Sequence, residues 1–256
     1  MKSRITLYRI ALLLAALLFW EFGSGYIIDT FWLSKPSLIA TSLWGSLKKG
    51  ELLSDLYITL EGAFYGYVLG SVGGLAFGLF LGQSETLARV LQPFILAIYG
   101  IPRIALAPIF VLWFGIALLS KVMMAGMMSF LLVFFSTYEG IRSVDLELQN
   151  VARVLGANRW QLFTRVTMPN ASPWIIAGLR IAIPQALVAA VVAEFIASTA
   201  GLGYRIMATT NTMDTSGTMA GIVVLMVLVV GLNTILDRVE HSLLKWRPKA
   251  TDNTNV

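Results

Sequence analysis

Polar side chains gather between Asp145 and Pro169, in the stretch DLELQNVARVLGANRWQLFTRVTMP, although long apolar runs lie on both sides. The stretch combines Arg153, Arg159 and Arg165 with apolar residues. Such a surface suits either an acidic cleft of a partner protein or the anionic headgroups of a membrane. We therefore expect this segment to act by contact, and the residue types alone leave both kinds of partner open.

Residue types for other chemistry are scarce in the chain. It contains no cysteine, so neither disulfides nor thiol chemistry are available. His241 is the single histidine, which argues against a histidine-rich metal site. The sequence has no G-x-x-x-x-G-K-[ST] phosphate loop. We therefore expect the chain to be no enzyme and to bind no ATP, metal or other cofactor itself.

A short helix is predicted to open the polar segment. Asp145 is placed to cap a helix over Leu146–Leu155. The apolar stripe of this helix consists of Leu148, Val151, Ala152 and Leu155. Gly156 follows and can supply the left-handed residue that ends the helix.

A second helix is predicted over Arg159–Val166. Asn158, with Gln161 three residues later, fits a capping box at its start. Pro169 and Pro173 are then expected to redirect the chain into the next apolar run, because a proline lacks the backbone donor that continues a helix. The two short helices would lie on one face of the membrane.

The composition predicts an all-α integral membrane protein. Hydrophobic residues make up 57% of the 256 residues and charged residues 13%, whereas soluble domains have about 45–50% and roughly 25%. The apolar runs have the length of helices and not of barrel strands. About six transmembrane helices are predicted, over residues 5–26, 56–81, 91–118, 121–138, 174–197 and 219–236.

We divide the chain into three parts. Residues 1–55 hold the first span and an external segment with a short amphipathic helix near Ser37–Leu47. A signal peptide is the alternative for the first apolar run, but no A-x-A-like cleavage site follows it. Residues 56–246 form the core of the bundle, including the segment 145–169, and residues 247–256 form a tail.

The positions of the basic residues predict the orientation. Most of the 19 lysines and arginines fall on the side that holds the N-terminus, if the chain crosses six times. Basic residues are enriched in cytoplasmic loops. Both termini and the segment 145–169 are therefore expected in the cytoplasm, and the stretch Glu21–Asp55 outside.

Two kinds of feature suit spans that move. Six glycines recur every four residues in the second span: Gly62, Gly66, Gly70, Gly74, Gly78 and Gly82. They allow close helix approach, but successive members drift by about 40° around a straight helix. We expect this glycine ladder to spiral over much of the surface and to serve packing with one or more neighbours.

Prolines and charges within spans mark candidate positions along a solute path. Gly100–Pro108 is read as a bend, because prolines disturb a helix and irregular backbone is tolerated where it lines a cavity. Arg103 either faces the path or extends to the interface, and Glu194 is either a gate or a satisfied packing group. The candidate path residues are Gly100, Pro102, Arg103, Pro108, Pro184 and Glu194.

The polar segment resembles the cytoplasmic EAA loop of ABC-importer permeases: E-A-A, three residues, Gly, nine residues, Ile, one residue, Leu-Pro. Here Asn150 to Ala152 stand at E-A-A, Gly156 at the glycine, Val166 at the isoleucine, and Met168 and Pro169 at Leu-Pro. The flanks PRIALAPIFVLWFGI and GLRIAIPQALVAAVVAEFIASTAGLGY are also similar to that family, closest to the nitrate, taurine and alkanesulfonate branch. The resemblance covers roughly Tyr57 to the end of the chain.

The resemblance implies a type I importer bundle in the bacterial inner membrane, whose loop is a coupling helix seated in a separate ATPase subunit. ATP and Mg would then bind to that partner. It further implies a homodimer that receives a small solute from an external, periplasmic binding protein, with lipid around it and no nucleic-acid partner. The expected coupling residues are Asn150, Ala152, Arg153, Leu155, Gly156, Ala157, Arg159, Trp160 and Pro169. Asn150 departs from the family's glutamate and lacks its charge.

Two alternatives concern transport itself. A gradient-driven secondary transporter would need ionisable relays near the membrane midplane or an inverted repeat, and neither is visible in the sequence. A membrane-anchored scaffold would leave the proline-interrupted spans without a role. The solute itself is open between a sulfonate-, nitrate- or taurine-like compound and a pyrimidine or vitamin precursor.

Overall fold

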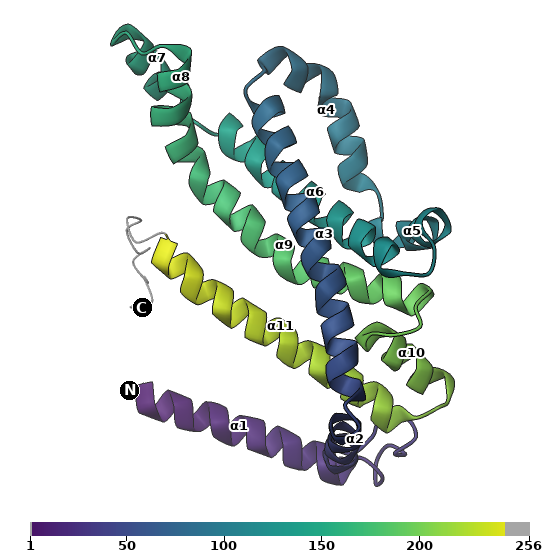
Figure 1. Cartoon of the computed structure of the whole chain (residues 1–256). Helices are drawn as coiled ribbons and strands as arrows, with labels where there is room; N and C mark the ends of the chain where they lie inside the picture. Colours follow the sequence, from purple (N-terminus) through teal and green to yellow (C-terminus); the bar gives the residue numbers. More distant parts are fainter. Residues whose placement is uncertain (1, 244–256) are drawn as a thin grey trace.

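The computed structural model describes residues 2–243, and the regular elements of this range are all helical (Figure 1). The basic tail residues Lys245, Arg247 and Lys249, and the predicted tail 247–256, lie outside the described residues. Within residues 2–243, five helices are long and apolar enough to cross a membrane. The elements containing them are α1 (Lys2–Gly23), α3 (Glu51–Gly82), α6 (Leu118–Arg142), the stretch Arg159–Ile196 that ends in α9, and α11 (Thr215–Leu243).

The third span, predicted over residues 91–118 with a bend at Gly100–Pro108, consists of separate elements. The chain forms α4 (Glu85–Gly100), a 3-10 turn η1 (Arg103–Leu106) and a short helix α5 (Ala107–Phe114). Ile101 is extended, with ψ 129°, and the backbone of Pro102 leaves the helical region with ψ 90°. Pro108 lies in the first turn of α5, where its missing donor costs nothing. The expected bend at Gly100–Pro108 is thus confirmed as a complete break.

The glycine ladder of α3 packs along a single helix, α6. A Cβ on Gly66 would lie 2.5 Å from the Cβ of Ala125, and a Cβ on Gly70 would lie 2.1 Å from the carbonyl oxygen of Gly126. At the far end, a Cβ on Gly82 would lie 2.9 Å from the Cβ of Ile141. The expected packing role is confirmed, with one neighbour, and the expectation that the ladder spirals over much of the helix surface is wrong. A row of i, i+4 residues forms a ridge inclined by about 26° to its helix, and α6 follows that ridge.

The same contacts show that α3 and α6 run parallel, because residue numbers rise together along both helices. The intervening residues 83–117 must therefore return across the thickness of the bundle. Only α4, η1 and α5 are available for that return, so the chain crosses a sixth time through a broken segment. The five continuous helices and this segment agree with about six crossings.

The other helices surround this pair. Helix α9 (Met168–Ile196) packs on both α6 and α3, and α11 lies on α10 (Leu202–Asn211) and α2 (Pro36–Lys48). The expected short helix at Ser37–Leu47 is thus confirmed. We call the end of the bundle at α2 and α10 the α10 end, and the opposite end, which carries α7 (Leu146–Val154), the α7 end. Figure 1 shows α1 reaching away from the bundle, with its C-terminal end at α2.

Buried charges join four helices at the α10 end. Lys121 of α6 and Glu194 of α9 are 3% and 1% exposed, and Nζ lies 3.0 Å from Oε1. The other carboxylate oxygen accepts a hydrogen bond from the backbone amide of Gly203 at 2.8 Å. The hydroxyl of Thr59 on α3 also bonds this carboxylate, at 2.9 Å.

Side chains of α3 also accept hydrogen bonds from the backbone amides at the start of α10. The backbone amide of Gly201 donates to Asp55 Oδ1 at 3.0 Å, and that of Leu202 donates to the Thr59 hydroxyl at 2.9 Å. Arg205 of α10 forms an ion pair with Asp55, with 2.6 Å between Nε and Oδ2. The first amides of a helix lack partners within it, so carboxylates stabilise this terminus through both hydrogen bonds and the helix dipole. We call this cluster the outer-end network, after the orientation that the basic residues predict. It comprises Asp55, Thr59, Lys121, Glu194, Gly201, Gly203 and Arg205.

Replacing Gly70 should separate α3 from α6. In Gly70→Ala the new methyl would overlap the backbone of Gly126, so we expect a loss of about 1–3 kcal/mol in stability from overpacking. Gly231→Ala on α11 is the matched control, because no atom lies within 4 Å of its Cβ position. Thermal unfolding of the purified protein in detergent measures both. Equal melting temperatures for the two variants would contradict the close contact.

Removing one partner of the buried ion pair should lower the stability of the protein more than removing both partners. Lys121→Met leaves the Glu194 carboxylate buried without its cation, and we expect a loss of about 3–5 kcal/mol. Adding Glu194→Gln should restore much of the melting temperature, since the remaining side chains are neutral. The exposed Lys49→Met serves as the control. A double variant no more stable than Lys121→Met would argue against the pairing.

Candidate functional site

The polar segment begins where α6 ends at Arg142. Val144 is buried and holds the chain against the bundle. Asp145 then caps α7, because its Oδ1 accepts a hydrogen bond from the backbone amide of Glu147 at 2.8 Å. The predicted cap and the predicted first helix are confirmed, with the helix ending at Val154.

The turn after α7 depends on one glycine. Gly156 has φ +85°, a conformation that disfavours residues with a side chain. Its amide donates to the carbonyl of Arg153, and the amide of Ala157 donates to the carbonyl of Ala152, both at 3.0 Å. These bonds close the end of α7 as a left-handed cap.

A capping box opens the next helix, α8 (Arg159–Leu162). Asn158 Oδ1 accepts from the Gln161 amide at 2.8 Å, and Gln161 Oε1 accepts from the Asn158 amide at 3.0 Å. This part of the sequence prediction is confirmed residue by residue. Both bonds connect residues only three apart, which is why the sequence reveals them.

The prediction that Pro169 and Pro173 redirect the chain is wrong. Helix α8 continues through a π-helical turn, η2 (Phe163–Thr167), directly into α9. Pro169 lies in the first turn of α9. Nearby side chains bond carbonyls of this stretch: Asn170 donates to Val166 at 2.7 Å, and Ser172 donates to Pro169 at 2.9 Å. The carbonyl of Pro169 is the one that Pro173 leaves without its helical donor. The second short helix is therefore the first part of a helix that spans the bundle.

Large apolar side chains are exposed where α7 meets α8. Val154, Leu155 and Trp160 are 87%, 82% and 71% exposed. None of the residues of α7 or α8 is buried. Arg153, Arg159 and Arg165 are exposed beside them. We call residues 145–169 the coupling turn, and its exposed surface combines apolar area with positive charge.

Asn150 is bonded within the coupling turn. Its Oδ1 accepts a hydrogen bond from Arg153 Nη1 at 3.2 Å, three residues further along α7. The amide therefore orients one of the exposed arginines. A glutamate at this position would place a negative charge beside Arg153 and reduce the positive charge of the surface.

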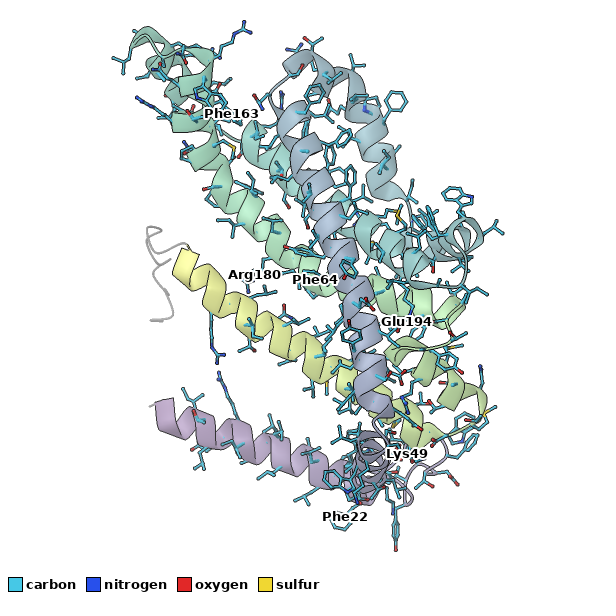
Figure 2. The ribbon with its side chains drawn as sticks, viewed as in Figure 1. Phe22, Lys49, Phe64, Phe163, Arg180 and Glu194 are labelled. Atoms are coloured by element: carbon cyan, nitrogen blue, oxygen red, sulfur yellow. The ribbon has the colours of Figure 1, made fainter. Side chains whose placement is uncertain are left out.

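The candidate path residues fall into three separate places. Gly100, Pro102, Arg103 and Pro108 all belong to the break between α4 and α5, and Pro184 lies within α9. Glu194 instead belongs to the outer-end network, where it is buried and bonded to Lys121, Thr59 and Gly203. Figure 2 places Glu194 and Phe163 near opposite ends of the helix that leaves the coupling turn.

Three charge pairings were not predicted from the sequence. Lys121 pairs with Glu194, and Arg205 pairs with Asp55. Arg180 of α9, labelled in Figure 2, is ion-paired with Asp237 of α11. The available signal was the placement of Arg180 inside an apolar run, since such charges pair with one another in membrane proteins.

Residues 74–245 match the family described as binding-protein-dependent transport system inner membrane component. The chain is 33% identical over 229 residues to the putative aliphatic sulfonates transport permease protein SsuC of Bacillus subtilis, covering 89% of this chain and 83% of that protein. It is 35% identical over 237 residues to the riboflavin transport system permease protein RibX of Chloroflexus aurantiacus, covering 91% and 88%. The formylaminopyrimidine transport permease protein ThiX of Halalkalibacterium halodurans is 32% identical over 236 residues, covering 92% and 94%.

Solved structures share the fold. A crystal structure of an amino acid ABC transporter with histidines aligns with a TM-score of 0.65 at 20% identity, covering 78% of this chain and 97% of that chain. An inward-facing MetNI methionine ABC transporter aligns with a TM-score of 0.64 at 19% identity, covering 75% and 95%. The chain belongs to the family of binding-protein-dependent transport system inner membrane components, the permease subunits of ABC importers.

Proposed function

We propose that the coupling turn docks into a cleft of a separate cytoplasmic ATPase subunit, with Asn150, Ala152, Leu155, Gly156, Ala157 and Pro169 shaping the contact. The observation that carries the proposal is the exposed apolar tip formed by Val154, Leu155 and Trp160 at the polar end of a membrane protein. Exposed apolar groups rimmed by charge mark interaction sites. ATP and Mg bind to the partner, and both termini lie on its side of the membrane.

A second copy of the chain completes the transporter. Helix α1 exposes large apolar side chains along its length, including Leu12 and Phe19, and lies away from the bundle. Helix α11 exposes Met226, Val227 and Val230. Lipid and the partner copy share these faces in the proposed homodimer. An external binding protein delivers the solute at the α10 end, and two ATPase subunits bind at the α7 end.

The continuous helix from α8 to α9 gives the docking site a direct mechanical role. Motion of Trp160 with the closing ATPase moves Arg159–Ile196 as one body, including the Glu194 end. Because the outer-end network joins α9 to α3, α6 and α10, the displacement reaches four helices together. The transporter then alternates between two states that ATP binding biases. The break at Gly100–Pro108 and Pro184 of α9 line the path between them.

The solute is a small polar or anionic organic molecule, of the sulfonate, nitrate or taurine type. The relative named for aliphatic sulfonates supports this class. Arg103 adds a positive charge in η1, at the break between α4 and α5. The relatives named for riboflavin and formylaminopyrimidine are as similar to the chain. They favour a vitamin precursor as the second candidate.

Charge reversal on the coupling turn should abolish ATPase binding. We expect the double variant Arg153→Glu, Arg159→Glu to lose at least tenfold in co-elution with the ATPase subunit, because like charges across an interface cost several kcal/mol. Arg238→Glu is the control, since it reverses an exposed arginine at the same end of the bundle. Co-purification followed by size-exclusion chromatography measures the complex.

Two results would contradict the docking proposal. One is full co-elution of the Arg153→Glu, Arg159→Glu variant. The other is solute uptake that persists when the ATPase is inactivated and collapses when an ionophore removes the ion gradient, which would assign the chain to the gradient-driven class.

Gly156 should matter for docking but not for the stability of the bundle. Gly156→Val must adopt a φ near +85°, which costs about 1–2 kcal/mol or distorts the turn, so we expect several-fold weaker ATPase co-elution. Gly156→Asn should bind nearly as well, because asparagine tolerates this conformation. No atom lies within 4 Å of the Cβ position and no residue of α7 or α8 is buried. The strain should therefore be relieved by distortion of the exposed turn without disturbing the packing of the bundle, whose melting temperature should be the same in both variants. Equal co-elution of Gly156→Val and Gly156→Asn with the ATPase subunit would contradict a role of the left-handed turn in docking.

A further inference from the structure

A small cavity lies between α4 and α6, apart from the coupling turn. Its volume is about 210 Å³. It is lined by Ala88, Arg89, Gln92, Tyr138, Glu139 and Arg142. Neither the coupling turn nor the candidate path uses any of these residues. The cavity therefore needs a separate explanation.

The cavity lies at the α7 end of the bundle, where membrane-spanning helices end and lipid headgroups are expected. It is formed by the start of α4, just after α3 ends at Gly82, and by the last turn of α6, which ends at Arg142. The coupling turn begins three residues later at Asp145, on the side that the charge bias places in the cytoplasm. Basic pockets between transmembrane helices on this side suit lipid headgroups.

The charges in the cavity are of both signs. Arg89 and Arg142 supply two guanidinium groups, whose planar donor forks match phosphate oxygens. Glu139 supplies a carboxylate from the same cavity. Among residues 2–243, neither the Glu139 carboxylate nor the Arg142 guanidinium forms an ion pair. A guest that carries both a phosphate and a primary ammonium would satisfy both signs at once.

Apolar side chains are exposed on a face of α4 that is turned away from the cavity. Val90 and Phe94 are 60% and 62% exposed, and they lie about 100° or more around the helix from the cavity residues Ala88, Arg89 and Gln92. Leu87 and Leu91 of the same helix pack inward, against the cluster that contains Tyr138. The exposed apolar face of α4 suits contact with acyl chains, which places the cavity on the same helix beside membrane lipid. A phospholipid headgroup is therefore favoured over a free phosphate compound.

We propose that the cavity between α4 and α6 binds the headgroup of phosphatidylethanolamine. The phosphate accepts hydrogen bonds from Arg89 and Arg142, and the ammonium donates to Glu139. The bound lipid bridges the return span to the end of α6, directly before the coupling turn. This assignment stands independently of the ATPase docking described above.

Native mass spectrometry of the purified protein tests the site. The detergent-solubilised chain is mixed with equal amounts of phosphatidylethanolamine, phosphatidylglycerol and phosphatidylcholine of the same acyl chains. We expect phosphatidylethanolamine to be retained roughly tenfold better than either competitor, the size of one charge-assisted hydrogen bond. Phosphatidylcholine has a quaternary ammonium that cannot donate to Glu139. Soluble phosphoethanolamine at the same concentration should displace little of the bound lipid, because it lacks the chains.

Three variants separate the contributions. Arg142→Gln should reduce retention of all three lipids, and Glu139→Gln should shift the preference from phosphatidylethanolamine to phosphatidylglycerol. Arg238→Gln, at the end of α11, should change neither. Melting temperatures of the lipid-free variants identify any that fail to fold. Equal retention of the three lipids by the unchanged protein, or a preference for phosphatidylglycerol, would overturn the proposal, as would an Arg142→Gln variant that binds like the original.

Discussion

The close parallel contact of α3 and α6 governs the rest of the bundle. A glycine every four residues gives α3 a face without side chains, and backbone atoms of α6 occupy that space. In a membrane no hydrophobic effect drives helices together, so van der Waals contact of this kind is a main source of stability. Because both helices run in the same direction, the chain between them must cross back. The broken α4–η1–α5 segment is the consequence, and it leaves irregular backbone at Gly100–Pro108 inside an otherwise helical protein.

The two ends of the bundle differ in whether their charged side chains are paired within the chain or exposed. At the α10 end, Lys121, Glu194 and Asp55 are buried and paired: Lys121 with Glu194, and Asp55 with the half-buried Arg205. Such a network loses most of its value when one member is removed, so it favours helices that move together. At the α7 end, apolar side chains and arginines are exposed on a turn that the bundle does not cover. One end is thus fixed within the chain, and the other is available to a partner.

Local interactions were predictable from the sequence, and long-range ones were not. The caps at Asp145, Gly156 and Asn158 depend on residues no more than five apart, so their spacing reveals them. The Lys121–Glu194 pair joins residues 73 positions apart, and Thr59 reaches Glu194 across 135 positions. The glycine ladder was recognised from the sequence, but the helix that packs on it was not. Glycines four residues apart drift by about 40° around the axis of α3, so they would leave a neighbour that ran straight along that axis. Helix α6 is inclined along the glycine ridge and therefore stays in contact with all of it.

The continuity of α8 with α9 shows why a proline is an uncertain boundary. Pro169 and Pro173 each lack the backbone N–H that would bond the carbonyl four residues earlier, so the sequence predicts that the helix ends near them. The structure keeps the helix because a π turn at Phe163–Thr167 shifts the hydrogen-bond register, and because Ser172 donates to the carbonyl that Pro173 leaves free. Pro169 directly follows this π turn, within the continuous helix and not at a free helix start. A π turn inside a helix is uncommon and concentrates at functional positions. Here it lies between the exposed Trp160 and the buried body of α9, where a rigid connection between a docking surface and a membrane span has a physical use.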